Sequence, residues 1–305
     1  MLFLGLRELM AKAMAGETAD FLLTLEEAQA GNSHAQREIG NRYLLGYGVA
    51  QDFAQAVHWF TQAARLRHAG AQKCLGDMYA NGMGVAQDYS AAIHWYQKAA
   101  NRSNAKACFN LGLMHQIGHG VEKDYAKGFA WQMKAAQQGY APAQFNVGLL
   151  CDEGRGVQKN RTQALEWLVR AAEQNHPTAQ YHVGRAYETG DGVARDEVHA
   201  AKWYRCAAYS GDYYAQIAYA NLHAEGRGVK RDRKKAYFWL TIAAKQQPLG
   251  AEMFDRLQSL GNFFMLSQMA QIEREVAQIE HEIRLRVPAK KFSTISARKA
   301  AGAKA

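Results

Sequence analysis

Residues 44–64 read LLGYGVAQDFAQAVHWFTQAA, and residues 80–100 read ANGMGVAQDYSAAIHWYQKAA. In both stretches two glycines flank one residue, a valine follows, and an acid stands ahead of a tryptophan. The two stretches begin 36 residues apart, and matching residues hold matching positions. This self-similarity at a fixed distance indicates a repeat architecture.

The same period relates residues over most of the chain. All six tryptophans are spaced by 36 residues: Trp59, Trp95, Trp131, Trp167, Trp203 and Trp239. The Gly-x-Gly-Val stretches begin at Gly46, Gly82, Gly118, Gly154, Gly190 and Gly226. An acid or its amide follows each of them: Asp52, Asp88, Asp124, Asn160, Asp196 and Asp232. No insertion interrupts the period, which predicts six units: 35–70, 71–106, 107–142, 143–178, 179–214 and 215–250.

Each unit carries the pattern of two amphipathic helices, because its small and apolar residues fall on one face at helical spacing. Gly-x-Gly is expected to end the first helix, since glycine readily adopts the left-handed conformation of a helix stop. The following acid or amide is expected to cap the second helix. An aliphatic-glycine pair such as Ile39-Gly40 and an Ala-Ala pair such as Ala63-Ala64 should let helices approach closely. The tryptophan is expected to be the core residue that fills the space between helix pairs.

This pattern resembles the Sel-one-like repeat (SLR) family, a relative of the tetratricopeptide repeats. The match rests on the aliphatic-glycine pair, the Gly-x-Gly-Val turn, the capping residue, the tryptophan and the Ala-Ala pair, in six copies. The resemblance implies an all-α fold, a right-handed α-solenoid of stacked helix-turn-helix repeats with helical caps. It also implies a concave groove that holds a protein partner, in roles such as bacterial signalling, regulation or host interaction.

The two ends depart from the repeat. Residues 1–34 contain two apolar-periodic runs, Phe3 to Met14 and Phe21 to Ala30, and are predicted to form an N-terminal helical cap. Residues 251–287 are predicted to form C-terminal capping or coiled-coil-like helices. Residues 288–305 are predicted to form a basic disordered tail.

A long helix is predicted within residues 263–287, and its apolar residues alternate at spacings of four and three: Met265, Met269, Ile272, Val276, Ile279 and Ile283. Two interpretations are open. The helix folds back along the last repeat as a cap, or it pairs with a partner or with a second copy of the chain.

Composition and charge narrow the class of protein. The 305 residues are 48% hydrophobic with a formal net charge of +9, and five of these charges are the lysines and arginines of the acid-free tail. The remainder is only mildly basic, so a nucleic-acid partner is not expected. Arg7 and Glu8 interrupt the apolar start, so we expect neither a signal peptide nor a transmembrane segment. A cytoplasmic protein is predicted, with export by a non-classical route left open.

No catalytic, cofactor or metal site is predicted. His115 and His119 have the spacing of a zinc helix but lack the glutamate of H-E-x-x-H. Phosphate-loop and nucleophile motifs are also absent from the sequence. Some secreted, cysteine-rich SLR proteins are associated with penicillin binding and hydrolysis, but the four cysteines here lack that regular ladder. A hydrolase of cell-wall or β-lactam substrates is therefore only the alternative to a non-catalytic scaffold.

By analogy with the tetratricopeptide relatives, the first helix of each unit should line the concave groove. The candidate partner-binding residues are those of the middle units at groove-facing positions: Phe109, Leu113, Gln116, Phe145, Leu149, Asp152, Tyr181, Arg185 and Glu188. The aromatic residues among them have the alternative of packing between helices. Leu113 and Leu149 are favoured as contacts, because polar residues hold that position in the other four units. The sequence thus predicts an interaction scaffold or adaptor that binds a peptide or helix.

Overall fold

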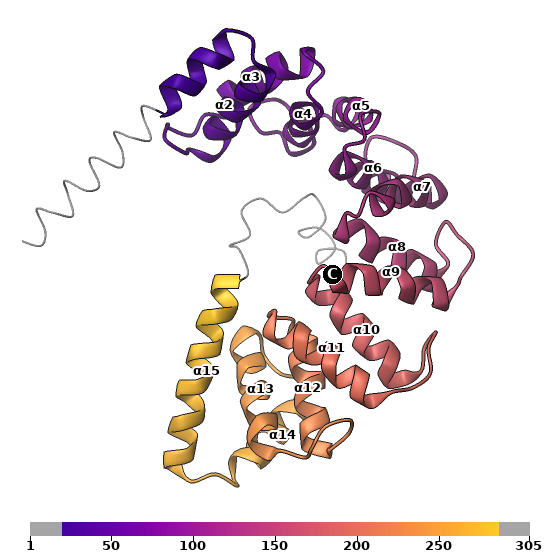
Figure 1. Ribbon diagram of the computed structural model, residues 1–305, viewed down its shortest axis with the longest axis vertical. Coiled ribbons are helices and arrows are strands. Elements are labelled where there is room, and N and C mark those ends of the chain that lie inside the picture. Colours follow the sequence, from indigo (N-terminus) through magenta and orange to yellow (C-terminus); the bar gives the residue numbers. More distant parts are fainter. Residues whose placement is uncertain (1–19, 287–305) are drawn as a thin grey trace, which may run out of the picture. The chain divides into compact units, whose positions relative to one another are not determined.

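The computed structural model describes residues 20–286, which fall into two compact units, 20–138 and 139–286 (Figure 1). Within these residues every regular element is a helix, so the fold is an all-α repeat solenoid. The predicted helical run from Phe3 to Met14 and the predicted disordered tail, 288–305, lie outside the described residues.

The first unit begins with a helix over residues 20–29, followed by three helix pairs. The pairs are α2 (Ser33–Leu45) with α3 (Phe53–Arg65), α4 (Ala69–Asn81) with α5 (Tyr89–Ala100), and α6 (Ala105–Ile117) with α7 (Tyr125–Gln137). Corresponding helices begin 36 residues apart, as the sequence period predicts.

The second unit continues with three more pairs and two further helices. The pairs are α8 (Ala141–Glu153) with α9 (Arg161–Glu173), α10 (Pro177–Thr189) with α11 (Glu197–Tyr209), and α12 (Tyr213–Glu225) with α13 (Arg233–Gln246). The last two helices are α14 (Ala251–Gly261) and α15 (Leu266–Arg286).

The turn within each repeat has the structure that the sequence predicts. Gly46 ends α2 with φ 70°, and Gly48 has φ 68°. Asp52 then caps α3, because its carboxylate accepts a hydrogen bond from the backbone N–H of Gln55 at 3.0 Å. Equivalent caps begin the other five second helices. The Gly-x-Gly stretch is therefore a helix stop and restart.

In four of the repeats, the second glycine of the turn lies against the repeat before it. A Cβ atom at Gly228 would lie 2.0 Å from the carbonyl oxygen of Glu197, the first residue of α11. The same close approach joins Gly84 to Phe53, Gly120 to Tyr89 and Gly192 to Arg161. Any side chain at these glycines would push the loop away from the preceding repeat.

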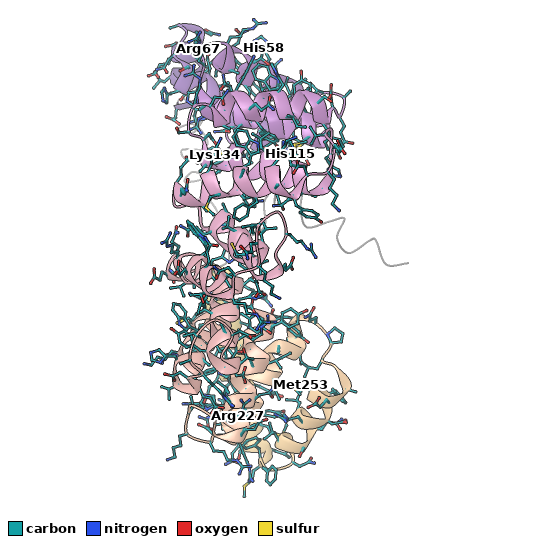
Figure 2. All side chains as sticks on the ribbon, turned by 90° about the vertical axis from the view of Figure 1, so that its right-hand side faces the viewer. His58, Arg67, His115, Lys134, Arg227 and Met253 are labelled. Atoms are coloured by element: carbon teal, nitrogen blue, oxygen red, sulfur yellow. The ribbon has the colours of Figure 1, made fainter. Side chains whose placement is uncertain are left out.

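The prediction that tryptophan is the core residue of every repeat is wrong. Only Trp167 and Trp239 are buried, and the other four tryptophans are half-buried. On three of the six second helices a cation three residues later lies over the indole ring, as Lys134 does at 4.2 Å from the ring centre of Trp131 (Lys134 is labelled in Figure 2). The indoles of Trp95 and Trp131 therefore lie at the edge of the core, with one side facing a charged group.

The residue after the tryptophan is buried in every repeat. These residues are Phe60, Tyr96, Gln132, Leu168, Tyr204 and Leu240. In five repeats this side chain lies against the glycine of the aliphatic-glycine pair; a Cβ atom at Gly76 would lie 2.4 Å from the ring of Tyr96. The glycine thus makes room for a large neighbour from the second helix of the same repeat.

The third repeat places a polar side chain at this central position. Gln132 is 0% exposed, and neither its amide nitrogen nor its amide oxygen has a hydrogen-bond partner among the described residues. Glycines on both helices bring the backbones close, since a Cβ atom at Gly112 would lie 2.9 Å from the carbonyl oxygen of Gly128. The α6–α7 pair therefore combines a close backbone approach with an unsatisfied amide.

The C-terminal helix α15 packs against α13, which is the arrangement that the capping interpretation expects. Ile272 and Val276 are fully buried in the core of the last repeat. Lys234 of α13 also pairs with Glu275 of α15 at 3.0 Å. Met265, the first residue of the predicted seam, lies ahead of α15 and stays exposed.

Candidate functional site

The candidate groove residues of α6, in the first unit, are not on an open surface. Phe109 is 6% exposed and Leu113 is 8% exposed, while Gln116 is half-buried. The expectation that Leu113 offers a surface contact is wrong. Polar residues at the same position in other repeats suggested exposure, but in α6 this position is covered and an apolar side chain fills it.

In the second unit the structure brings Leu149, Asp152 and Arg185 together. These residues of α8 and α10 line one small cavity of about 30 Å³, with His182 and Arg161 as further lining residues. Arg161 pairs with Asp191 at 2.8 Å across the same opening. A cavity of this size holds about one water molecule, so the region is suited to surface contact and not to enclosing a ligand.

Aromatic rings connect the first helices of the second unit. Phe145 of α8 stacks on His176 with ring centres 4.7 Å apart, and Tyr181 of α10 contacts Tyr214 of α12 at 5.9 Å. Phe145 and Tyr181 are half-buried, whereas Tyr214 is 61% exposed. The candidate aromatic residues thus pack between helices and also leave part of their rings accessible. We call the surface formed by Phe145, Leu149, Tyr181, Arg185 and Tyr214 the first-helix face.

Glu188, the last candidate, is held by its own repeat and by the next one. Its carboxylate accepts a hydrogen bond from the Tyr204 hydroxyl at 2.6 Å and pairs with Arg227 at 2.9 Å. In the first unit Asp77 has a related role, accepting from the Tyr96 hydroxyl at 2.8 Å and from the Asn110 amide at 3.1 Å. Burial, together with Asp77, raises the pKa of Tyr96, so this phenol remains a donor. Glu188 therefore joins the repeats together.

Comparison with protein families supports the repeat assignment. The Sel1 repeat model matches six times: residues 33–68, 70–104, 105–140, 141–176, 177–212 and 214–248. The chain belongs to the Sel1 repeat family. No curated protein matches it.

Several solved structures are similar to the chain. A Sel1 repeat protein from Oxalobacter formigenes is 33% identical, with 72% of this chain and 89% of that chain covered and a TM-score of 0.67. A protective antigen with an SLR fold from uropathogenic Escherichia coli is 23% identical, covering 92% of this chain and 85% of that one, with a TM-score of 0.39. An immunity protein from Pseudomonas aeruginosa is 20% identical, covering 70% and 81%, with a TM-score of 0.44.

The Sel1 repeats here hold two half-buried histidines to which the sequence did not point. His176 caps α10, because its Nδ1 accepts the backbone N–H of Ala179 at 3.2 Å. His182 lies between Phe145 and Tyr181, with ring centres at 5.6 and 5.5 Å. Burial lowers the pKa of both, that of His182 to about 4. The aligned positions in other repeats carry no histidine at His182 and mixed capping residues at His176, so the period alone does not reveal them.

We expect this Sel1 repeat protein to lose stability as the pH falls from 7 to 5. In the unfolded chain His176 and His182 are protonated near pH 6.5, whereas in the folded chain both stay neutral until a lower pH. Their stabilising effect is therefore complete above about pH 6.5 and is lost on the way to pH 4. The expected loss is about 1–2 kcal/mol by pH 5, measured by urea unfolding at both pH values.

A His182→Gln variant should show a smaller loss over the same range. His176→Asn serves as a second variant that keeps the cap, since Asn104 caps α6 in the same way. An equal loss of stability in the wild type and in both variants would contradict this assignment.

The described residues form surfaces suited to contact, and the groups that could react or bind a metal are few. Among residues 20–286 no group of three or more histidine, cysteine, aspartate or glutamate side chains could hold a metal ion. Burial raises the pKa of Cys74 to about 11, which keeps this thiol protonated and unreactive. No helix in the same range is long and apolar enough to cross a membrane.

Proposed function

We propose that this Sel1 repeat protein is a non-catalytic adaptor that binds an extended or helical segment of a partner protein on the first-helix face. Solenoids of this family typically serve as interaction scaffolds. The observation that carries the proposal is the partly exposed row of non-repeating aromatic, aliphatic and basic side chains on α8, α10 and α12. Aromatic residues and arginine are the side chains most often responsible for binding energy at protein interfaces.

The chemistry of this face indicates what the partner offers. Arg185 is exposed, and no carboxylate of the described residues lies within ion-pair distance of it. Leu149, one helical turn from Phe145, adds an apolar contact beside it. A segment with an apolar side chain next to an acidic one fits both groups. No specific observation favours the hydrolase alternative.

The test compares two double variants of the full chain. Leu149→Asp with Arg185→Glu changes the first-helix face, and Val198→Asp with Lys202→Glu makes the same chemical change on exposed residues of α11. Partner proteins that copurify with the wild type from cells are purified first. Their binding to the wild type and to each variant is then measured directly. We expect the first variant to bind at least about tenfold more weakly and the second to bind like the wild type. If both variants bind equally well, the first-helix face is not the binding site.

A further inference from the structure

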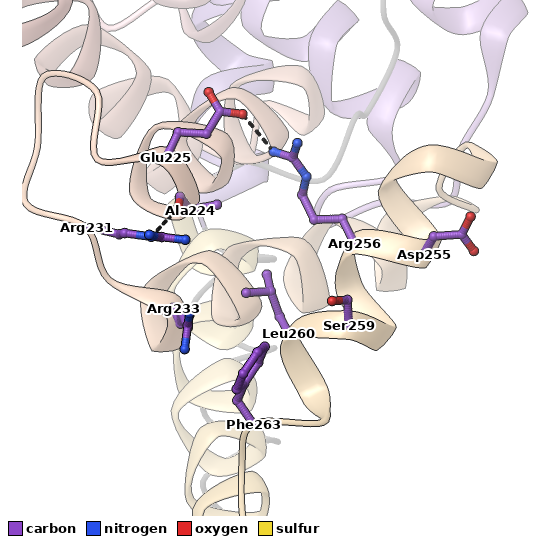
Figure 3. A pocket seen from close by; sticks show the side chains of 9 residues that line it. All are labelled: Ala224, Glu225, Arg231, Arg233, Asp255, Arg256, Ser259, Leu260 and Phe263. Atoms are coloured by element: carbon purple, nitrogen blue, oxygen red, sulfur yellow. Dashed lines mark hydrogen bonds and ion pairs between the residues drawn. The ribbon is translucent and has the colours of Figure 1, made fainter.

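A second surface lies at the C-terminal end of the last repeat. A cavity of about 580 Å³ opens between the end of α12, the start of α13 and the helix α14 (Figure 3). Its lining includes Arg231, Arg233, Arg256 and Phe263. This volume is within the range of ligand and headgroup sites, and it is far larger than the cavity on the first-helix face.

The cavity lies where the repeat pattern stops. At Gly84, Gly120, Gly192 and Gly228, the second glycine of the turn lies against the first residue of the preceding second helix, as Gly228 does against Glu197. One period after Gly228 the chain holds Phe264 instead, and the Gly-x-Gly-Val turn is replaced by Asn262-Phe263-Phe264-Met265. Phe263 of this stretch lies against Arg233, the first residue of α13, which stays exposed.

Two arginines at this cavity have no acidic partner. Arg231 donates its Nε to the backbone carbonyl of Ala224 at 2.9 Å, and Arg233 lies 4.2 Å from the ring centre of Phe263. Among the described residues no carboxylate forms an ion pair with either guanidinium. Two acidic residues line the cavity among the described residues, Glu225 and Asp255. Glu225 already pairs with Arg227 at 2.7 Å and with Arg256 at 3.0 Å.

Phe263, which lies beside Arg233, begins a short stretch with three exposed apolar side chains. Phe263 is 58% exposed, Met265 is 74% exposed, and Leu266, the first residue of α15, is 86% exposed. We call Phe263, Met265 and Leu266 the apolar tip. Adjacent exposed apolar residues of this size mark an interaction surface.

We propose that the apolar tip and the Arg231–Arg233 pair together bind the surface of an anionic lipid membrane. The tip inserts between headgroups, while the two guanidiniums contact lipid phosphates at the cavity. An acidic peptide lying in the cavity would pair with the arginines but leave Met265 and Leu266 in water, because neither lines the cavity. A lipid surface engages both groups at once, and for this reason we favour it. The basic tail of the chain carries like charge and does not complement the arginines.

The test is cosedimentation of the full chain with vesicles of phosphatidylcholine alone or with one third phosphatidylglycerol. The wild type should bind the anionic vesicles only. Arg231→Gln with Arg233→Gln should weaken binding about 30-fold, from the usual contribution of each basic residue near such a surface. Met265→Ser with Leu266→Ser should weaken it about tenfold or more, through the loss of apolar burial.

The matched control removes two exposed basic residues of the first unit, Arg102→Gln with Lys106→Gln, and should bind like the wild type. Circular dichroism of each variant checks that the fold is intact. The proposal is overturned if the wild type does not bind anionic vesicles, or if the control loses as much binding as the Arg231 and Arg233 variant. It is also overturned if the tip variant keeps full binding, and binding of polyglutamate that depends on the arginines alone would then indicate an acidic protein partner.

Discussion

Replacing Gly228 by alanine is expected to lower the free energy of unfolding by about 3 kcal/mol or more. Two costs add up at this position. The residue has φ 64°, which an L side chain adopts at a penalty, and its Cβ atom would lie 2.0 Å from the carbonyl oxygen of Glu197. Neither atom belongs to a flexible side chain, so the loop has to move off α11.

Gly31→Ala is the control that measures the cost of the positive φ alone, without the contact to a preceding repeat. Gly31 also has a positive φ, 93°, but a Cβ atom added there would have no neighbouring atom within 4 Å. Urea unfolding of the two variants should show a cost of about 1 kcal/mol for Gly31→Ala and a clearly larger one for Gly228→Ala. Equal costs would mean that the contact between loop and preceding repeat contributes nothing.

A Gln132→Leu variant is expected to be more stable than the wild type by up to about 3 kcal/mol. Both polar atoms of the Gln132 amide are buried without a partner among residues 20–286, and leucine occupies the equivalent position of the fourth and sixth repeats. Leucine has a similar size and no polar atoms to desolvate. The change therefore removes a cost without opening a large cavity.

Gln72→Leu is the matched control, because the same substitution there removes an amide that forms a hydrogen bond. The Gln72 side chain is also buried, but its Nε2 donates to the carbonyl of Ala64 at 3.2 Å. Thermal and urea unfolding should show that Gln72→Leu destabilises the protein while Gln132→Leu stabilises it. If Gln132→Leu is destabilising as well, the amide has a role that its contacts do not reveal.

The period made the helices and turns predictable, since each repeated residue type has a local physical reason to recur. A glycine with positive φ ends a helix at its own position, and a capping carboxylate binds a backbone N–H two or three residues away. Both effects are local, so the residue type alone indicates them in the sequence. Burial was less predictable. The position after the tryptophan is central in all six repeats, yet it holds phenylalanine, tyrosine, leucine or glutamine and has no constant identity.

Contacts between repeats were missed for a similar reason. Gln36, Gln72, Gln180 and Gln216 each donate to an alanine carbonyl eight residues earlier, which ties one repeat to the next. The sequence shows the recurring glutamine but not its partner, because the acceptor is backbone and leaves no sequence signal. Of the candidate site residues, Leu149, Asp152 and Arg185 line one cavity, whereas Leu113 is buried. The cavity beside α14 could not be predicted, since the residues after Gly250 no longer follow the repeat.

The four loops that lie on the preceding repeat give the repeats within each unit a direction. A repeat lost from the C-terminal end would uncover a helix start, whereas one lost from the N-terminal end would leave a glycine loop with nothing to cover. The two ends of the array therefore expose different groups, and different capping segments are needed to bury them. If a gene duplication copies one unit inside the array, the copy has a preceding repeat for its loop to cover and a following loop to cover its own helix start. A copy placed at either end of the array has only one of these two contacts. Growth of such a protein by internal duplication keeps the 36-residue phase unbroken, as it is from Ala35 to Gly250.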